Sequence, residues 1–156
     1  MRLFRSTTPG ELHLGLAILR VVTGIIFMAH GAQKFFLFGV DGVAAGFAQA
    51  GIPLAAAAAP AVALVELIGG LALVAGLVTR IAALGLAIVM VVAMLVVHLS
   101  AGFFLPDGIE FTLMLLGAAV TLAITGAGAF SVDALLMRRV APGTAHARND
   151  RIRRVA

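Results

Sequence analysis

The chain has 156 residues, of which 62% are hydrophobic and 12% are charged, and its formal net charge is +4. A soluble domain is closer to half apolar and a quarter charged, so this composition excludes a soluble fold of one-domain size and indicates a bilayer protein. The absence of cysteine excludes disulfides, thiolate catalysis, Cys-ligated iron–sulfur clusters and covalent c-type haem attachment. The positive charge lies mainly in a C-terminal tail, which favours anionic lipid headgroups as partners and not nucleic acid.

The first predicted membrane-spanning helix covers residues 12–36, after a cytoplasmic segment of residues 1–11. Thr8 is a predicted N-cap, Pro9 suits the first helical position and Glu11 completes a capping box. The helix exceeds the roughly 20 residues needed to cross, so we expect its outer end to extend beyond the hydrocarbon. No cleavable signal peptide is predicted, because the apolar run is too long and carries Arg20.

Residues 37–59 form a long connection that is apolar and not polar. Asp41 could cap a short helix over residues 42–50, which Gly51 and Pro53 would end. We expect this helix to lie at the membrane interface or to re-enter the bilayer, and an irregular loop is the alternative.

Three further spans are predicted at residues 60–78, 81–99 and 109–126. The tight link between the first two of them requires that those helices are neighbours. Beyond the last span, Ser131 could cap a short amphipathic helix at the interface, and a basic tail covers residues 138–156. The predicted fold class is therefore all-α. It is an integral membrane four-helix bundle over residues 12–137, with short interfacial helices after the first and fourth spans.

The basic residues predict an orientation. With four crossings, the arginines before the first span, in the link after the second, and after the fourth all fall on one side. The positive-inside rule then places both termini in the cytoplasm. The arginines in question are Arg2, Arg5, Arg80, Arg138, Arg139, Arg148, Arg151, Arg153 and Arg154.

Six ionisable residues are predicted at membrane depth, where each charge is expensive and needs an explanation. At about 1.5 Å per residue, all except Arg20 fall in the outer half of the bilayer. The six are Arg20, His30 and Lys34 in the first span, Glu66 in the second, His98 near the end of the third, and Glu110 at the start of the fourth.

Glu66 is the hardest of these to explain away, because a carboxylate near the bilayer centre should be protonated or paired. His30 or Lys34 is the nearest partner in depth, and the long side chain of Arg20 could also reach it. The alternatives are that Lys34, His98 and Glu110 mark the outer interface and that Arg20 snorkels toward headgroups. An interior polar network could serve chemistry or could only fix the helix register.

One face of the first span carries small and polar residues, and we expect it to point into the bundle because lipid offers these groups no partner. Its glycines would let a neighbouring helix approach closely, and the same packing role is predicted for Gly69 and Gly70 of the second span. The face consists of Arg20, Gly24, Phe27, Gly31 and Lys34, flanked by Thr23 and His30.

Motifs along the chain resemble those of the DoxX family. They are LRVVTG at 19–24 and HGAQKF at 30–35, ELIGG at 66–70 and GLVTR at 76–80, VHL at 97–99, GFF at 102–104 before Glu110, and SVDALL at 131–136. The resemblance implies a bacterial inner-membrane protein with four helices. Some members are linked to respiratory or redox assemblies, including a small membrane subunit of thiosulfate:quinone oxidoreductase, and others to oxidative-stress complexes.

The residues and the resemblance leave four alternative functions. The first is a membrane subunit of an oxidoreductase complex with a quinone-type ligand at His30, Glu66 and His98, because His and Glu can relay the protons that quinone reduction takes up. The second is a non-catalytic assembly protein whose polar residues only hold the helices together. The third is binding of haem b with His30 and His98 as axial ligands, and these two histidines are its only support. A transporter is disfavoured, because no span shows the paired broken-helix pattern.

The expected partners are membrane lipids and either a second protein or further copies of the chain, without nucleic acid. No catalytic residue and no metal site are assigned, and the sequence does not identify the ligand.

Overall fold

The computed structural model describes residues 6–140, and within that range the chain is almost entirely helical and contains no strand. Arg2, Arg5 and the basic tail from residue 141 onward lie outside the described residues. The elements in chain order are α1 (Pro9–Ala32), the π-helix η2 (Gln33–Leu37), α2 (Val40–Gln49), α3 (Ala55–Ala75), α4 (Thr79–Val92), the π-helix η3 (Ala93–His98), the 3-10 helix η4 (Leu99–Ala101), α5 (Glu110–Thr125) and α6 (Val132–Val140).

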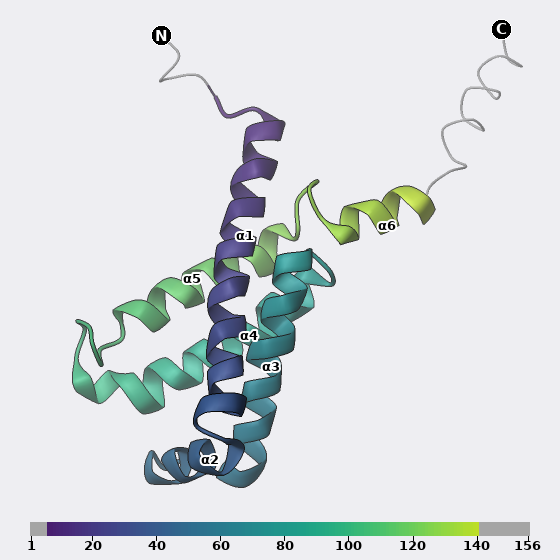
Figure 1. Cartoon of the computed structure of the whole chain (residues 1–156). Helices are drawn as coiled ribbons and strands as arrows, with labels where there is room; N and C mark the ends of the chain where they lie inside the picture. The colour runs from purple at the N-terminus through teal and green to yellow at the C-terminus, as the bar shows by residue number, and fades with distance from the viewer. Residues whose placement is uncertain (1–5, 141–156) are drawn as a thin grey trace, which may run out of the picture.

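Two antiparallel helix pairs form the bundle. The most extensive contact joins α1 to α3, and the next joins α4 to α5. Figure 1 shows that the second pair crosses the first at an angle, that α2 lies across one end of α1 and α3, and that α6 leaves from the opposite end, where α1 begins. We call these two ends the α2 end and the α6 end.

The core is apolar, and each of the four main helices contributes to it. Phe27 of α1, Leu73 of α3, Leu86 of α4 and Leu122 of α5 are each 1% exposed or less. The outward faces of the same helices carry exposed leucine, isoleucine and valine side chains, which is the pattern of a bundle whose solvent is lipid.

Within residues 6–140, three helical stretches are long and apolar enough to cross a membrane. They are residues 9–37, 55–75 and 79–101. The prediction of an all-α membrane bundle is therefore confirmed. The fourth helix, α5, is apolar but has only 16 residues. At 1.5 Å per residue it is about 24 Å long, less than a hydrocarbon core of about 30 Å, so a fourth crossing stays a prediction.

The signal that starts the first helix is confirmed. Thr8 is the N-cap, Pro9 follows it, and the capping box is complete. The backbone N–H of Glu11 donates to the Thr8 hydroxyl over 3.3 Å, and the Glu11 carboxylate accepts from the Thr8 backbone N–H over 2.8 Å. This reciprocal pair satisfies two N–H groups that an unmodified helix start would leave without partners.

Two predicted helix starts were wrong. The helix expected from residue 60 begins at Ala55, with Pro60 inside it, because a run of alanine favours helix strongly enough to extend it before the proline. The short helix expected from residue 42 begins at Val40, and its N-cap is Gly39, whose φ is +70°. Asp41 therefore lies in the first turn and makes no side-chain cap.

Candidate functional site

The centre of the site is an ion pair between two helices. The Lys34 ammonium of η2 lies 2.5 Å from a carboxylate oxygen of Glu66 on α3, and the two side chains are 18% and 4% exposed. The prediction that Glu66 is paired is therefore met by Lys34, one of its two expected partners. In a bundle that faces lipid, such a pair is costly to bury and is a candidate for function.

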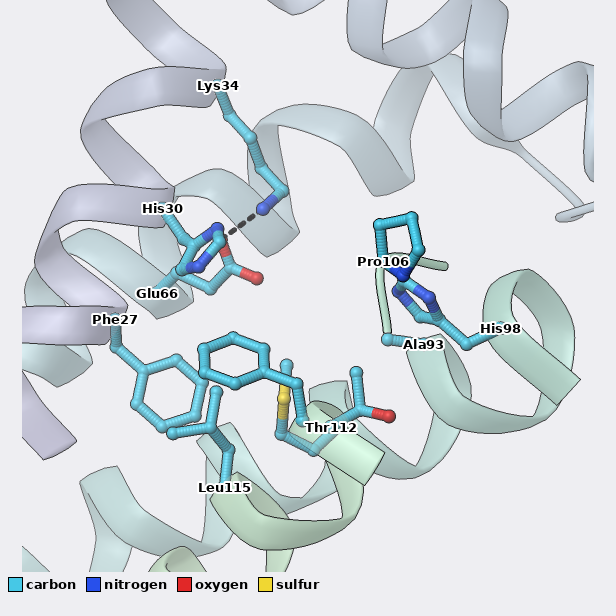
Figure 2. Close-up of a pocket in the computed structure, with 11 residues that line it drawn as sticks. Phe27, His30, Lys34, Glu66, Ala93, His98, Pro106, Thr112 and Leu115 are labelled. Carbon is cyan, nitrogen blue, oxygen red and sulfur yellow. Dashed lines mark hydrogen bonds and ion pairs between the residues drawn. The ribbon is translucent and has the colours of Figure 1, made fainter. Parts of the chain in front are cut away.

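The ion pair faces a cavity of about 250 Å³ between α1, α3, α4 and α5, which we call the polar chamber. Figure 2 shows His30 beside Glu66 on one side of it, and His98 with Pro106 on the other. The lining consists of Phe27, His30, Lys34, Glu66, Met90, Ala93, His98, Pro106, Phe111, Thr112 and Leu115.

Two histidines bring ring nitrogens to this chamber from different helices. The His30 ring packs on Phe111 of α5, with ring centroids 5.9 Å apart. The His98 Nδ1 lies 2.8 Å from the backbone carbonyl oxygen of Asp107. Because a carbonyl only accepts, Nδ1 carries a proton, and in the neutral ring Nε2 is left as an acceptor. The loop before α5 therefore holds the tautomer and orientation of His98.

Both ends of the site lie in π-helical turns. Lys34 belongs to η2 and His98 to η3, which continue α1 and α4 respectively. A π turn is rare, because it inserts an extra residue into the helix, which usually costs stability. Such turns are often found at functional sites. The sequence shows no signal for either turn, so residue spacing alone does not predict them.

Arg20 is not part of this cluster, although the sequence placed it among the candidates. It is 3% exposed, which also contradicts the snorkelling alternative. Its Nη1 donates to the carbonyl oxygens of Leu73 and Val74 at the end of α3, and its Nη2 donates to that of Phe130 over 2.7 Å. The guanidinium therefore gives the carbonyls at the end of α3 a side-chain donor, at the α6 end of the bundle.

Glu110 also lies apart from the chamber. Its carboxylate accepts a hydrogen bond from the backbone N–H of Leu105 over 2.7 Å, and its side chain is not among those lining the cavity. Its observed contact holds the loop that precedes α5. The six predicted ionisable residues thus divide into a cluster of four and two residues with separate structural contacts.

A structural contact that the sequence does not predict involves Asp133 of α6. Its carboxylate oxygens accept from the backbone N–H groups of Val78 and Thr79, over 2.8 and 3.1 Å. Asp133 therefore caps the start of α4, while Ser131 caps α6 itself by accepting from the N–H of Ala134 over 3.1 Å. Only the second of these contacts is local, which explains why the pattern could predict Ser131 and not the role of Asp133.

The four candidate packing glycines all lie at helix contacts. A Cβ added to Gly24 would lie 2.7 Å from the carbonyl oxygen of Gly70, and one on Gly70 would lie 2.6 Å from that of Gly24. A Cβ on Gly31 would lie 2.5 Å from the backbone nitrogen of Leu67. These three permit the close approach of α1 and α3 that brings Lys34 to Glu66, whereas Gly69 faces the Leu86 side chain of α4 at 3.2 Å.

Comparison with known proteins gives one family. The DoxX family model matches residues 15–99. A Bacillus subtilis protein named "Putative oxidoreductase CatD" is 36% identical over 125 residues, which are 80% of this chain and 89% of that protein. A Mycobacterium tuberculosis protein named "Uncharacterized membrane protein Rv3486" is 32% identical over 133 residues, which are 78% of this chain and 80% of that protein. A Haemophilus influenzae protein is 31% identical over 122 residues, 76% of this chain and 87% of its own length. No solved structure matches.

Proposed function

The chain belongs to the DoxX family of membrane proteins, and on that premise we propose that it is a small membrane subunit of a redox-linked complex that binds a quinone-type ligand in the polar chamber. The observation that carries the proposal is the largely buried pair of Lys34 and Glu66, which lines the polar chamber together with His30 and His98. The oxidoreductase name of the Bacillus subtilis relative supports the link to redox chemistry.

The chemistry of the chamber suits a quinone ring. Quinone carbonyl oxygens accept hydrogen bonds, and Lys34 and the ring N–H of His30 are donors at the wall of the chamber. The Nδ1–H of His98 is already directed at the Asp107 carbonyl, so its Nε2 is placed to accept from a quinol hydroxyl. Reduction of a quinone to a quinol takes up two electrons and two protons. In this proposal a redox partner protein supplies or accepts the electrons, and His30 and Glu66 hold or transfer the protons. The volume of about 250 Å³ is small for a ligand pocket, for which about 300–1,000 Å³ is usual, and suits a ring better than a whole lipid-soluble quinone.

The proposed setting is the inner membrane of a bacterium, with α5 as a fourth crossing and both termini in the cytoplasm. Arg80 follows the turn between α3 and α4 at the α6 end, and Arg138 and Arg139 lie on α6 itself (Figure 1). This distribution of charge supports the orientation by the positive-inside rule. A partner protein or further copies of the chain are proposed as the assembly.

The absence of tryptophan and tyrosine from the chain permits a direct test. Phe111→Trp places the only indole at the chamber, and Phe130→Trp places it at the exposed α6 end as a control. Titration with 2,3-dimethoxy-5-methyl-1,4-benzoquinone, a quinone ring without a long chain, should quench the first variant with saturation and the second without it. Linear and equal quenching of both variants would refute binding of a quinone in the polar chamber.

Isosteric substitutions test the residues. Glu66→Gln should weaken the affinity for the same probe by about tenfold or more, since it removes a charged group from the site and leaves Lys34 without its partner. Asp41→Asn makes the same chemical change on an exposed side chain of α2 and should leave the affinity unchanged. The probe should also raise the melting temperature of the unmodified chain, because a ligand that binds only the folded state stabilises it.

A non-catalytic assembly protein is the second candidate, and one observation favours it. The Lys34–Glu66 pair joins η2 to α3 across the same interface at which Gly24 and Gly70 meet, so the pair could serve only to fix the register of the helices. In that case Glu66→Gln would lower the melting temperature and the yield of the assembled complex, and the quinone probe would affect neither.

A further inference from the structure

A second cavity lies beside the polar chamber, between α2, α3 and α4. Its volume is about 410 Å³, and we call it the α2 chamber. Phe47 of α2 and Ile52, in the connection after α2, cover it, while Val62 of α3 lines its inner side. The helix α2 is held in this place by its contact with α3, where Val43 is buried.

The two chambers share a wall. Four residues line both cavities, namely Lys34, Glu66, Ala93 and His98. The ion pair and His98 therefore lie at the boundary between the two chambers. In Figure 2, Ala93 and His98 lie on η3, across the cavity from Lys34 and Glu66. A ligand held at this boundary can therefore extend to both sides of it.

The two chambers differ in chemistry. Apart from the shared wall, the polar chamber has the polar side chains of His30 and Thr112, whereas every other side chain that lines the α2 chamber is apolar. Three of these apolar side chains, those of Ile88, Val92 and Val97, are exposed on the outward face of α4 and η3. The α2 chamber thus borders the surface that faces lipid, and an apolar chain could enter it from the bilayer.

From this juxtaposition we infer that the ligand is an amphiphile that occupies both chambers, with its polar ring in the polar chamber and its apolar chain in the α2 chamber. The inference rests on the proposed function and deepens it, because it assigns the ligand to the membrane-soluble quinones and not to ring-only ones. It also gives α2 a role, which is to cover the chain.

The test compares two probes that share one ring, the ring-only benzoquinone and its decyl-chain derivative, in detergent with the full chain. Val62→Phe fills the α2 chamber and should lower the affinity for the decyl probe by about tenfold, the lower end of what a misfitted group costs in an apolar pocket. The ring-only probe should bind within about twofold of its original affinity. Val65→Phe is the matched control and should change neither affinity. Val65 lies about one turn further along α3, in a separate groove between α3 and α4, and does not line the α2 chamber.

The outcomes separate the two proposals. If Val62→Phe lost affinity equally for both probes, or kept its affinity for the decyl probe, the assignment of the decyl chain to the α2 chamber would be refuted. The proposed quinone site in the polar chamber would remain. Failure of both probes to bind the unmodified chain would overturn the proposed function itself.

A second measurement does not depend on filling the cavity. In Phe47→Trp, a bromine at the end of the decyl chain should add quenching beyond that of the unbrominated probe, and in Phe111→Trp it should add none. Added quenching in Phe111→Trp alone would place the decyl chain in the polar chamber and overturn the inference.

Discussion

Replacing Glu66 by leucine should destabilise the bundle by about 3–5 kcal/mol, because it leaves the mostly buried Lys34 ammonium without its carboxylate. At the observed separation of 2.5 Å and an effective dielectric constant of about 20, the attraction between the two charges is about 6–7 kcal/mol. Desolvation of each ion costs several kcal/mol, so most of that attraction only offsets the burial of the pair.

The magnitudes therefore predict a strong non-additivity. Lys34→Met alone should also cost about 3 kcal/mol or more, since Glu66 is 4% exposed and would remain charged or would have to take up a proton. The double variant Lys34→Met/Glu66→Leu has no buried charge left at this place, and its stability should lie within about 1–2 kcal/mol of the original chain.

Unfolding of the purified full chain in detergent, followed by far-ultraviolet circular dichroism, gives the three free energies for a double-mutant cycle. Asp41→Leu, on an exposed side chain, is the control and should change the stability by no more than about 0.5 kcal/mol. If the loss in the double variant equals the sum of the two single losses, the two groups are not coupled and the reasoning fails. The folded double variant should also have lost its affinity for the quinone probe. This loss is not expected if the pair has only a structural role.

Three further predictions concern packing, capping and topology. Gly70→Ala should cost about 1–3 kcal/mol in the same unfolding assay, because its Cβ would lie 2.6 Å from a backbone oxygen of α1. Gly117→Ala, which has open space, should be neutral or stabilising by up to about 1 kcal/mol, and equal losses for the two would contradict the close packing. Asp133→Ala should cost about 1–2 kcal/mol and increase hydrogen exchange at the start of α4, which it caps; unchanged exchange there would argue against that cap. Because the chain has no cysteine, a membrane-impermeant maleimide on intact cells should label Ala45→Cys and not Arg138→Cys, and labelling of both would refute the fourth crossing.

Part of the site could be predicted from the first span alone. Four of the five residues in the predicted stripe of small and polar residues are buried, and so is Thr23 on its flank, whereas Lys34 and His30 are partly exposed. The prediction succeeded because the angular position of a residue on a helix follows from its number, and because lipid is a poor solvent for polar groups.

The partners of the charged residues could not be predicted in the same way. Depth along the bilayer made Lys34 and His30 equal candidates for Glu66, and it left Arg20 within reach. The structure assigns Lys34 to Glu66 and directs Arg20 to the end of α3. That choice depends on how α1 and α3 are rotated and how closely they approach, which a one-dimensional estimate of depth does not contain.

The motifs along the chain indicate its family. Without the structure, the sequence also shows that the protein lies in a membrane, that it is helical, where its first helix begins and which face of that helix is buried. These properties follow from composition, local capping and helical periodicity, which act over a few residues. The packed structure was needed to show that two π turns present Lys34 and His98 to one cavity, that Glu110 lies outside it, and that an ion pair separates the polar chamber from the apolar α2 chamber. These depend on contacts between helices far apart in the chain, and the physical reason is that the rotation, tilt and spacing of packed helices are set by all their side chains together.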